Sequence, residues 1–311
     1  MSLRDQSKLK AIVYGGSGFL GSHVADALSG DGHDVRLFDK SPSPYLRADQ
    51  EMILGDLCSA DQVIEAARGC DLLFNFAGIA DIDEAHANPA QTVQVNVGGT
   101  VNTLQAAKEA KAQRYIFAST VYVYSTMGSM YKASKQAAEC FIETFHEQHD
   151  VDYTVLRFGT LYGRRADRRN RIHSILQDAL ETGSIEYPGS GEAVREFIHV
   201  RDAAQMTLRI LDDEYANKHL ILTGQEKMRM SDLLRMISEL MSNDVSWVCK
   251  EEEPAGHYMV TPYSFQPRLG HKLVPDDFID LGQGLLDCLS ELHEAKEHVS
   301  ANISVEKHSQ R

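Results

Sequence analysis

The sequence lacks the patterns that mark disulfide-bonded, zinc-binding and membrane-spanning proteins. Its five cysteines are odd in number and widely spaced, and none forms a C-x-x-C pair. This usage is typical of reduced thiols and predicts neither a disulfide framework nor a metal site. The thirteen histidines include no H-E-x-x-H motif. There is no apolar run of about 18 residues and no signal-peptide core near the N-terminus, so we expect a cytoplasmic protein without a membrane partner.

The sequence also has few basic residues relative to acidic ones. The 311 residues carry 31 Lys and Arg against 45 Asp and Glu, which gives a formal net charge of -14. Such an acidic chain is repelled by nucleic acid and by anionic membranes, so neither is expected as the main partner. A small anionic ligand in a local basic pocket remains compatible with this balance. The length suits one large α/β domain, or a core domain with a smaller one attached.

What the sequence does have, over its first half, is an alternation of short apolar runs and longer helical patterns. This alternation is typical of a parallel sheet built from β-α-β units, which binds ligands at the carboxyl ends of its strands. Helices are predicted over Phe19–Leu28 and Val93–Ala110. The predicted strands are Ala11–Tyr14, Asp34–Phe38, Leu72–Phe76, Tyr115–Ala118 and Tyr153–Arg157.

A glycine-rich loop follows the first predicted strand. Gly15, Gly18 and Gly21 open a helix, and such spacing lets backbone N–H groups approach a pyrophosphate at the positive helix end. Asp39, at the end of the second strand, suits an adenosine ribose and repels a 2′-phosphate, which favours NAD over NADP. Lys40, next along the chain, weakens that preference. Asp56 and the following Leu57 suit either a contact to the adenine edge or a helix cap.

Tyr131 and Lys135 lie four residues apart in a helical pattern, downstream of Ser119 and Thr120. That spacing places both side chains on one helix face, where the Lys135 cation favours ionisation of the Tyr131 phenol. A phenol normally titrates at a pKa of about 10, so a neighbouring cation is what would make it a useful base at neutral pH. The alternative reading is an ordinary solvated helix face. The glycine loop and Asp39 favour the catalytic reading.

Together these motifs resemble the extended short-chain dehydrogenase/reductase superfamily, and within it the NAD-dependent sugar-nucleotide epimerases and dehydratases. The stretch Asn75–Gly78, Asn96 and the run Arg195–Asp202 extend the resemblance over most of the first 220 residues. It implies that Thr120 orients a sugar hydroxyl, that Tyr131 takes its proton, and that Lys135 also binds the nicotinamide ribose. Further cofactor contacts are implied for Phe19, Leu20, Asp56, Leu57, Ala77, Gly78 and Asn96. Substrate contacts are implied for Ser119, Thr160, Arg164, Arg165 and Arg195.

The resemblance also implies a division of the chain. Residues 1–161, with 195–222 returning to them, are predicted to form the NAD-binding domain of Rossmann type. A smaller α/β substrate-binding part is predicted from residues 162–194 and 223–295, with helices over Ile172–Glu181 and Ser231–Met241, and a polar tail over 296–311. A homodimer is implied, with the helices around 93–110 and 131–147 pairing across a two-fold axis.

Three departures from the family pattern narrow the expected reaction. Val121 and Tyr122 stand where many 4,6-dehydratases and decarboxylases have an acidic residue, and the loop from Thr120 to Tyr131 is short. Thr160 replaces an Asn and Arg164 replaces a Pro. Five arginines between residues 164 and 171, with Arg195, form either a grip on a nucleotide diphosphate or a solvated face.

We therefore expect oxidation at C4 of a GDP-, UDP- or dTDP-linked sugar, giving a 4-keto sugar or its 4-epimer. The alternatives are a 4,6-dehydratase and a non-catalytic NAD-binding sensor. The stretches Phe117–Ser125 and Thr261–Phe265 also resemble a narrower group of bacterial surface-polysaccharide enzymes, including the type that oxidises C4 of a GDP-heptose.

Overall fold

The fold is taken from a computed structural model, which describes residues 3, 8–225, 227–242, 244–250 and 256–263. By its internal contacts the chain divides into Met1–Gln266 and Pro267–Arg311. The second unit lies outside the described residues, as do the predicted tail 296–311 and the end of the Thr261–Phe265 stretch. Within the described part, no helix has both the length and the apolar character that crossing a bilayer requires.

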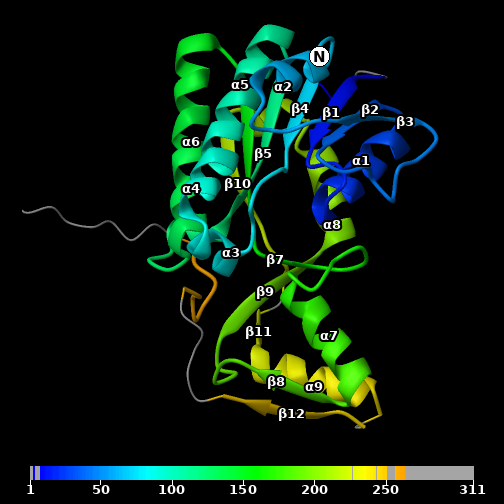
Figure 1. The fold of residues 1–311 in the computed structure, drawn as a ribbon, viewed down its shortest axis with the longest axis vertical. Coiled ribbons are helices and arrows are strands. Elements are labelled where there is room, and N and C mark those ends of the chain that lie inside the picture. Colours follow the sequence, from blue (N-terminus) through cyan, green and yellow to red (C-terminus); the bar gives the residue numbers. More distant parts are fainter. Residues whose placement is uncertain (1–2, 4–7, 226, 243, 251–255, 264–311) are drawn as a thin grey trace, which may run out of the picture. The chain divides into compact units, whose positions relative to one another are not determined.

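A seven-stranded sheet organises the part of the chain shown in Figure 1, and its strand order is β10-β6-β5-β4-β1-β2-β3. Every pairing in it is parallel. The predicted doubly wound α/β fold is therefore confirmed. Its strands are β1 (Lys10–Tyr14), β2 (Asp34–Asp39), β3 (Gln50–Leu54), β4 (Leu72–Asn75), β5 (Arg114–Thr120), β6 (Tyr153–Phe158) and β10 (Lys218–Leu222).

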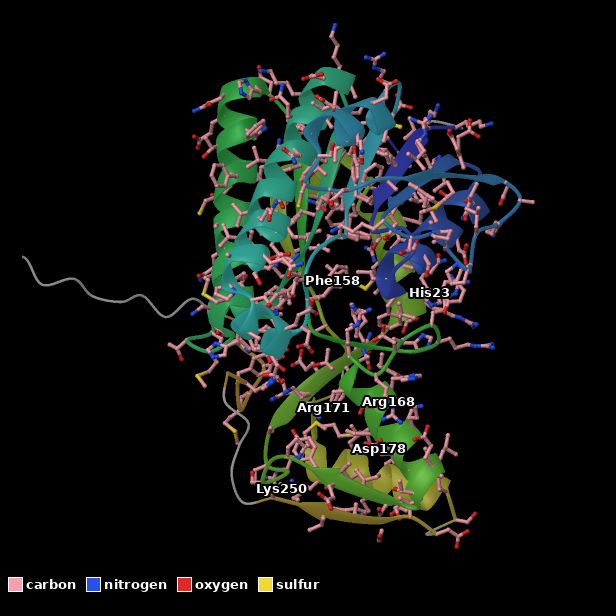
Figure 2. The ribbon with its side chains drawn as sticks, viewed as in Figure 1. His23, Phe158, Arg168, Arg171, Asp178 and Lys250 are labelled. Carbon is pink, nitrogen blue, oxygen red and sulfur yellow. The ribbon has the colours of Figure 1, made fainter. Side chains whose placement is uncertain are left out.

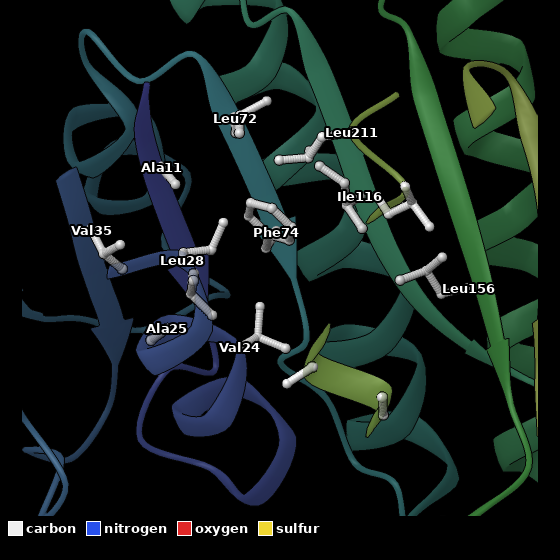
Figure 3. Packing of buried hydrophobic residues seen from close by; sticks show 14 of the residues in the cluster. Ala11, Val24, Ala25, Leu28, Val35, Leu72, Phe74, Ile116, Leu156 and Leu211 are labelled. Atoms are coloured by element: carbon white, nitrogen blue, oxygen red, sulfur yellow. The ribbon is translucent and has the colours of Figure 1, made fainter. Parts of the chain in front are cut away.

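Helices cover both faces of this sheet because successive strand residues point to opposite sides. Along β1, Ala11 and Val13 belong to one buried cluster, and Ile12 and Tyr14 to the other. Figure 3 shows the first cluster, in which Val24, Ala25 and Leu28 of a helix pack near Leu72 and Phe74. That face carries α1 (Phe19–Gly30) and α8 (Val200–Arg209), and the other carries α2 (Ala60–Ala67), α5 (Gly99–Ala110) and α6 (Ser129–His149).

The helix predicted over Val93–Ala110 exists, but its first part is wound more loosely. Short helices α3 (Ile82–Ala87) and α4 (Pro89–Thr92) lead into a π-helical segment, η2 (Val93–Gly98), before α5 begins. Single π-helical turns of this kind often accompany functional sites. The loosened turn contains Asn96, whose buried side chain returns in the site below.

After β6 the chain builds smaller elements around a separate apolar cluster that includes Ile175, Tyr187 and Leu234. The predicted helices there are confirmed as α7 (Arg171–Thr182) and α9 (Met230–Leu240). β9 (Val194–His199) lies between β7 (Thr160–Tyr162) and β11 (Lys227–Arg229), so the chain rejoins the seven-stranded sheet only at β10. The remaining elements are β8 (Ser184–Tyr187), β12 (Ser246–Cys249) and two 3-10 turns, η3 (Val121–Tyr124) and η4 (Asp213–Tyr215).

Candidate active site

A cavity of about 970 Å³ opens at the carboxyl ends of the sheet strands. The residues that follow β1, β2 and β4 line one end, which we call the glycine end: Gly15, Gly18, Asp39, Ala77 and Gly78. We call the other the tyrosine end, lined by Thr120, Tyr122, Tyr131, His257 and Tyr258. Phe158 and Arg171, which Figure 2 labels, line the same cavity. A parallel sheet of this kind binds its ligands at this edge.

Close backbone approach at the glycine end requires glycine. Gly15 has φ +79°, and a Cβ on it would lie 2.7 Å from the Ala77 backbone nitrogen. A Cβ on Gly21 would collide with the carbonyl oxygen of Gly15. Gly18 precedes α1 and gives it no side-chain cap, and within the described chain no acidic residue occupies the first turn of this helix. The helix therefore presents its positive end to the cavity, as a pyrophosphate site needs.

The predicted ribose carboxylate lies where the sequence places it. Asp39 ends β2 and lines the cavity, and its Oδ2 accepts a hydrogen bond from the Ser17 backbone N–H at 3.1 Å. Lys40 is engaged elsewhere, because its Nζ lies 3.4 Å from Asp56 Oδ2. Because Lys40 pairs with Asp56, it does not argue against the preference for NAD over NADP that Asp39 implies.

The helix-cap reading of Asp56 is wrong, and its contact with the adenine edge stays a prediction. Its Oδ1 accepts from the Cys58 backbone N–H at 2.9 Å, and this bond is the main reason that the pKa of Asp56 is lowered. The bond closes a local turn, whereas α2 begins later and has Ser59 as its N-cap. Among the described residues that line the cavity, Leu57 is present and Asp56 is not.

Tyr131 and Lys135 line the cavity from α6, and the activation of the phenol by the Lys135 cation stays a prediction. Burial raises the pKa of Tyr131 to about 12, and the hydrogen bond to the Thr120 side chain is what opposes this rise. Lys135 Nζ donates to the Ala118 carbonyl at 2.8 Å and lies 4.7 Å from the centre of the Phe117 ring. Burial lowers the pKa of Lys135 to about 8, against the opposing charge of Glu139.

Asn96 supports the cavity wall from behind. Its Oδ1 accepts from the Ile79 backbone N–H at 2.7 Å, and its Nδ2 donates to the Ile79 carbonyl and to Ser134 Oγ, both at 2.9 Å. The side chain is 2% exposed and acts as a brace, and the cofactor contact implied for it stays a prediction. Asn96 also explains why residue 78 is a glycine. Gly78 has φ +149°, and a Cβ on it would lie 2.8 Å from Asn96 Oδ1.

Ser119 also faces a buried partner rather than offering its hydroxyl freely to a ligand. Its Oγ donates to Glu139 Oε1 at 2.5 Å, and Arg157 Nη2 donates to Glu139 Oε2 at 2.6 Å. Burial alone would raise the pKa of Glu139, but hydrogen bonds from His219, Arg157 and Ser119 outweigh it and hold that pKa below its ordinary value. No motif in the sequence predicts this network, although Glu139 lies four residues after Lys135 on the same helix.

The arginine run is divided between the cavity and the surface, and a grip of its cavity-lining members on a nucleotide diphosphate stays a prediction. Arg164 is not among the described residues that line the cavity, and its carbonyl oxygen lies 2.9 Å from His23 Nε2. Arg165, Arg169 and Arg171 line the cavity, while Arg168 lies on the surface. Most of the run is neutralised locally, and Figure 2 labels one such pair. The pairs are Arg165 with Asp26, Arg168 with Asp178 and Glu181, and Arg169 with Asp167.

A late segment of the chain, residues 256–263, closes the tyrosine end. The Gly256 carbonyl accepts from the Gly128 backbone N–H at 2.8 Å, and the Met259 carbonyl accepts from the Val194 backbone N–H at 2.6 Å. The Arg195 guanidinium stacks 4.3 Å from the centre of the Tyr258 ring, and Thr160 lines the cavity nearby. The family-like stretch Thr261–Phe265 begins within this segment, but no sequence pattern predicts that the segment closes the cavity, because its partners lie far away in the chain.

Comparison with known proteins identifies the family. The sequence profile of the NAD dependent epimerase/dehydratase family matches residues 11–222. The chain belongs to this family. Membership confirms the predicted enzyme class and the predicted NAD cofactor, and the glycine end fits that cofactor, since Gly15, Gly18 and Asp39 line the cavity beside the uncapped start of α1.

Individual relatives catalyse different reactions. The chain is 26% identical over 261 residues, 75% of it and 80% of the relative, to the UDP-N-acetyl-alpha-D-glucosaminuronate decarboxylase of Bacillus cytotoxicus. It is 24% identical over 230 residues, 65% of each chain, to the dTDP-D-glucose 4,6-dehydratase of Homo sapiens. The UDP-glucose 4-epimerase of Thermus thermophilus, solved with NAD, shares the fold with a TM-score of 0.73, 20% identity and coverage of 85% of this chain and 95% of that one.

Proposed function

We propose that the protein oxidises the C4 hydroxyl of a nucleotide-diphosphate sugar, then releases the 4-keto sugar or reduces it again to the 4-epimer. One observation carries the proposal: Tyr131, hydrogen-bonded to Thr120, lines the same cavity as the glycine end. When bound, NAD supplies the acceptor for the hydride from C4. The relatives named for epimerase, dehydratase and decarboxylase reactions on UDP- and dTDP-sugars support the substrate class.

In this proposal the residues of the glycine end hold the cofactor. Gly15, Gly18 and Gly21, with Phe19 and Leu20, receive the pyrophosphate at the start of α1, and Asp39 accepts hydrogen bonds from the adenosine ribose. Leu57, Ala77 and Gly78 complete the walls around it. Lys135 lies one helical turn from Tyr131 and binds the nicotinamide ribose.

Tyr131 is the base and Thr120 its partner. The Thr120 hydroxyl orients the substrate C4 hydroxyl and lowers the pKa of Tyr131, which burial alone holds high. The buried Lys135 has a pKa of about 8, so it remains mostly protonated at neutral pH and adds positive charge to the site. The proton leaves the sugar oxygen for the phenolate as the C4–H bond breaks.

The rest of the substrate lies toward the smaller elements. Arg195, Arg165 and Arg171 line that part of the cavity, with Thr160 on β7, and we assign the diphosphate to them. We also propose that residues 162–194 and 223–295, of which 264–295 lie outside the described residues, form the substrate-binding part, since Tyr187, Met230 and Tyr258 of these ranges line the cavity. The helices η2, α5 and α6 are our proposed homodimer interface, and a role in bacterial surface-polysaccharide synthesis extends the proposal further.

Val121 and Tyr122 weigh against a dehydratase that uses a carboxylate acid, since neither side chain offers one. A sensor that only binds NAD has no use for a tyrosine hydrogen-bonded to Thr120 beside the cofactor site. Both alternatives therefore fit the site less well than C4 oxidation does.

Incubation with GDP-, UDP- and dTDP-sugars, followed by mass spectrometry, tests the proposal. Loss of two hydrogens marks a 4-keto product, and an unchanged mass with altered retention marks an epimer. Loss of one water would establish the dehydratase instead. A panel that neither changes any sugar nor reduces the bound NAD would favour the sensor.

A further inference from the structure

The tyrosine end contains two proton-bearing groups that C4 oxidation does not use. The Tyr122 hydroxyl lies 3.0 Å from His257 Nδ1, and both side chains line the cavity. The Tyr122 ring also lies 6.2 Å from the Tyr131 ring, centre to centre, in an edge-to-face arrangement. A phenol bonded to an imidazole beside a substrate cavity is an arrangement that can move a proton.

The resting protonation of the pair follows from its surroundings. Burial lowers the pKa of His257, Arg195 of β9 and Arg171 of α7 lower it further, and Asp83 and Asp81 oppose them. Burial likewise raises the pKa of Tyr122. At neutral pH both groups are therefore uncharged, and the tautomer in which Nδ1 accepts from the Tyr122 hydroxyl is the one that can take its proton.

Main-chain hydrogen bonds and one ring contact hold Tyr122 and His257 in place. His257 is carried by the segment that bonds to Gly128 and Val194, and the Tyr122 ring packs 4.4 Å from the Tyr258 ring. Tyr122 itself follows β5 directly, and its backbone N–H donates to Thr120 Oγ1 at 3.3 Å. The pair thus has a fixed position next to the residue that orients the sugar hydroxyl in our proposal.

We infer that Tyr122 and His257 form a second acid–base pair, which exchanges the proton on a carbon adjacent to the sugar ketone. The C–H bond breaks, its electron pair becomes the enolate double bond, and the carbonyl π pair moves to the ketone oxygen. The carbon proton passes to Tyr122 Oη while the tyrosine proton passes to His257 Nδ1. While the enolate is bound, the protons on the pair exchange with solvent, and the reverse transfer then places a solvent proton on the carbon and restores the ketone, so no oxidant or reductant is consumed.

The inference rests on the proposed function for its substrate, a 4-keto sugar, but it is tested without the oxidation step. GDP-, UDP- and dTDP-linked 4-keto-6-deoxyhexoses are supplied directly to the full chain in D2O. Mass spectrometry then measures deuterium at the carbons next to the ketone, against a sample without protein. C4 oxidation can therefore fail in its own assay while proton exchange succeeds, and the reverse also holds.

We expect the wild-type protein to accelerate the exchange and Tyr122→Phe to slow it by roughly 10²-fold or more. His257→Asn places an amide oxygen near the Nδ1 position, so it keeps an acceptor for Tyr122 but cannot take its proton. The same loss in that variant identifies proton transfer rather than support. Tyr263→Phe is the matched control, because Tyr263 lies on the same segment, 42% exposed, and packs beside Lys227.

Three results would overturn the inference. They are no exchange above the protein-free rate with any of the three ketones, undiminished exchange in Tyr122→Phe, and wild-type exchange in His257→Asn. A second readout needs no turnover: the nitrogen chemical shifts of His257, assigned by their loss in His257→Asn, should report Nδ1 as the unprotonated acceptor. Those shifts should change in folded Tyr122→Phe, and unchanged shifts would contradict the pairing.

Discussion

The glycine end and the tyrosine end of the cavity are built in opposite ways. Gly15, Gly21 and Asp39 belong to a single β-α-β unit, and the two glycines allow a close approach of backbone that a side chain would obstruct. Tyr122, Tyr131 and His257 come from distant parts of the chain and act through their polar atoms. The geometry of the glycine end is therefore set within one local unit, whereas the geometry of the tyrosine end depends on contacts between distant parts of the chain. Substitutions at the two ends should fail in different ways.

The largest effect is expected from Tyr131→Phe. The ring and its edge contact with Tyr122 remain, but the hydroxyl that takes the sugar proton is gone. Turnover should fall roughly 10²- to 10⁴-fold, and NAD should still bind, because the glycine end is untouched. Tyr263→Phe controls for loss of a hydroxyl. Turnover of the Tyr131 variant near the wild-type value would remove Tyr131 from the mechanism.

Glu139→Gln tests the buried network behind the tyrosine end. Removing one partner of the ion pair with Arg157 should cost about 3–5 kcal/mol in the free energy of unfolding, measured by urea denaturation. Glu143→Gln, one turn further along α6, is the control. Glu143 also contacts His219, but its side chain is 49% exposed, so its loss should cost less than about 1 kcal/mol. Equal costs would show that the network adds nothing special.

The same network predicts a pH dependence. The folded pKa of Glu139 is held below its ordinary value, so its contribution to stability is fully present above that ordinary pKa of about 4.3. The contribution is lost as the pH falls toward and through the folded pKa. The wild-type protein should therefore lose more stability on acidification than Glu139→Gln, and parallel curves would contradict this.

At the glycine end, Gly21→Ala should act through the backbone. The new Cβ would collide with the Gly15 carbonyl, at a cost of about 1–3 kcal/mol, and NAD affinity measured by calorimetry should fall with it. Gly30→Ala in the same helix is the matched control, since a Cβ there meets open space. We expect the control to be neutral or to stabilise by up to about 1 kcal/mol. Similar losses in both variants would contradict the steric account.

The smallest effects concern cofactor selectivity. Asp39→Asn removes the charge from the ribose carboxylate and should weaken NAD binding about 10-fold. Lys40→Ala breaks only an exposed pair with Asp56 and should change NAD affinity by less than about 1 kcal/mol. A larger effect of the Lys40 variant than of the Asp39 variant would reverse the assignment.

The contrast between the two ends also explains what the sequence predicts well. Gly15 and Asp39 are readable because turn, strand and helix follow one another within a single unit, so spacing alone implies geometry. The strands are readable as short apolar runs, such as the one from Ala11 to Tyr14. Asn96 and Ser119 fall in family motifs, yet only packing reveals that each faces a buried partner.

Three-dimensional contacts decide the remainder. The pairing of Tyr122 with His257 joins residues 135 positions apart, and no periodicity reports such a distance along the chain. The four-residue spacing correctly predicts that Lys135 and Tyr131 lie on one helix. It does not predict that the Lys135 side chain donates to the Ala118 carbonyl. Spacing fixes which face of a helix a residue occupies, and not which partner its flexible side chain selects.

The central claim is that the hydride leaves C4 of the sugar. Any sugar nucleotide that the panel shows to be a substrate can be prepared with deuterium at C4 and mixed with the protein carrying its bound NAD. We predict that mass spectrometry of the extracted cofactor will find the deuterium on the nicotinamide, and that Tyr131→Phe will abolish this transfer. Product formation with a cofactor that carries no deuterium would contradict the account.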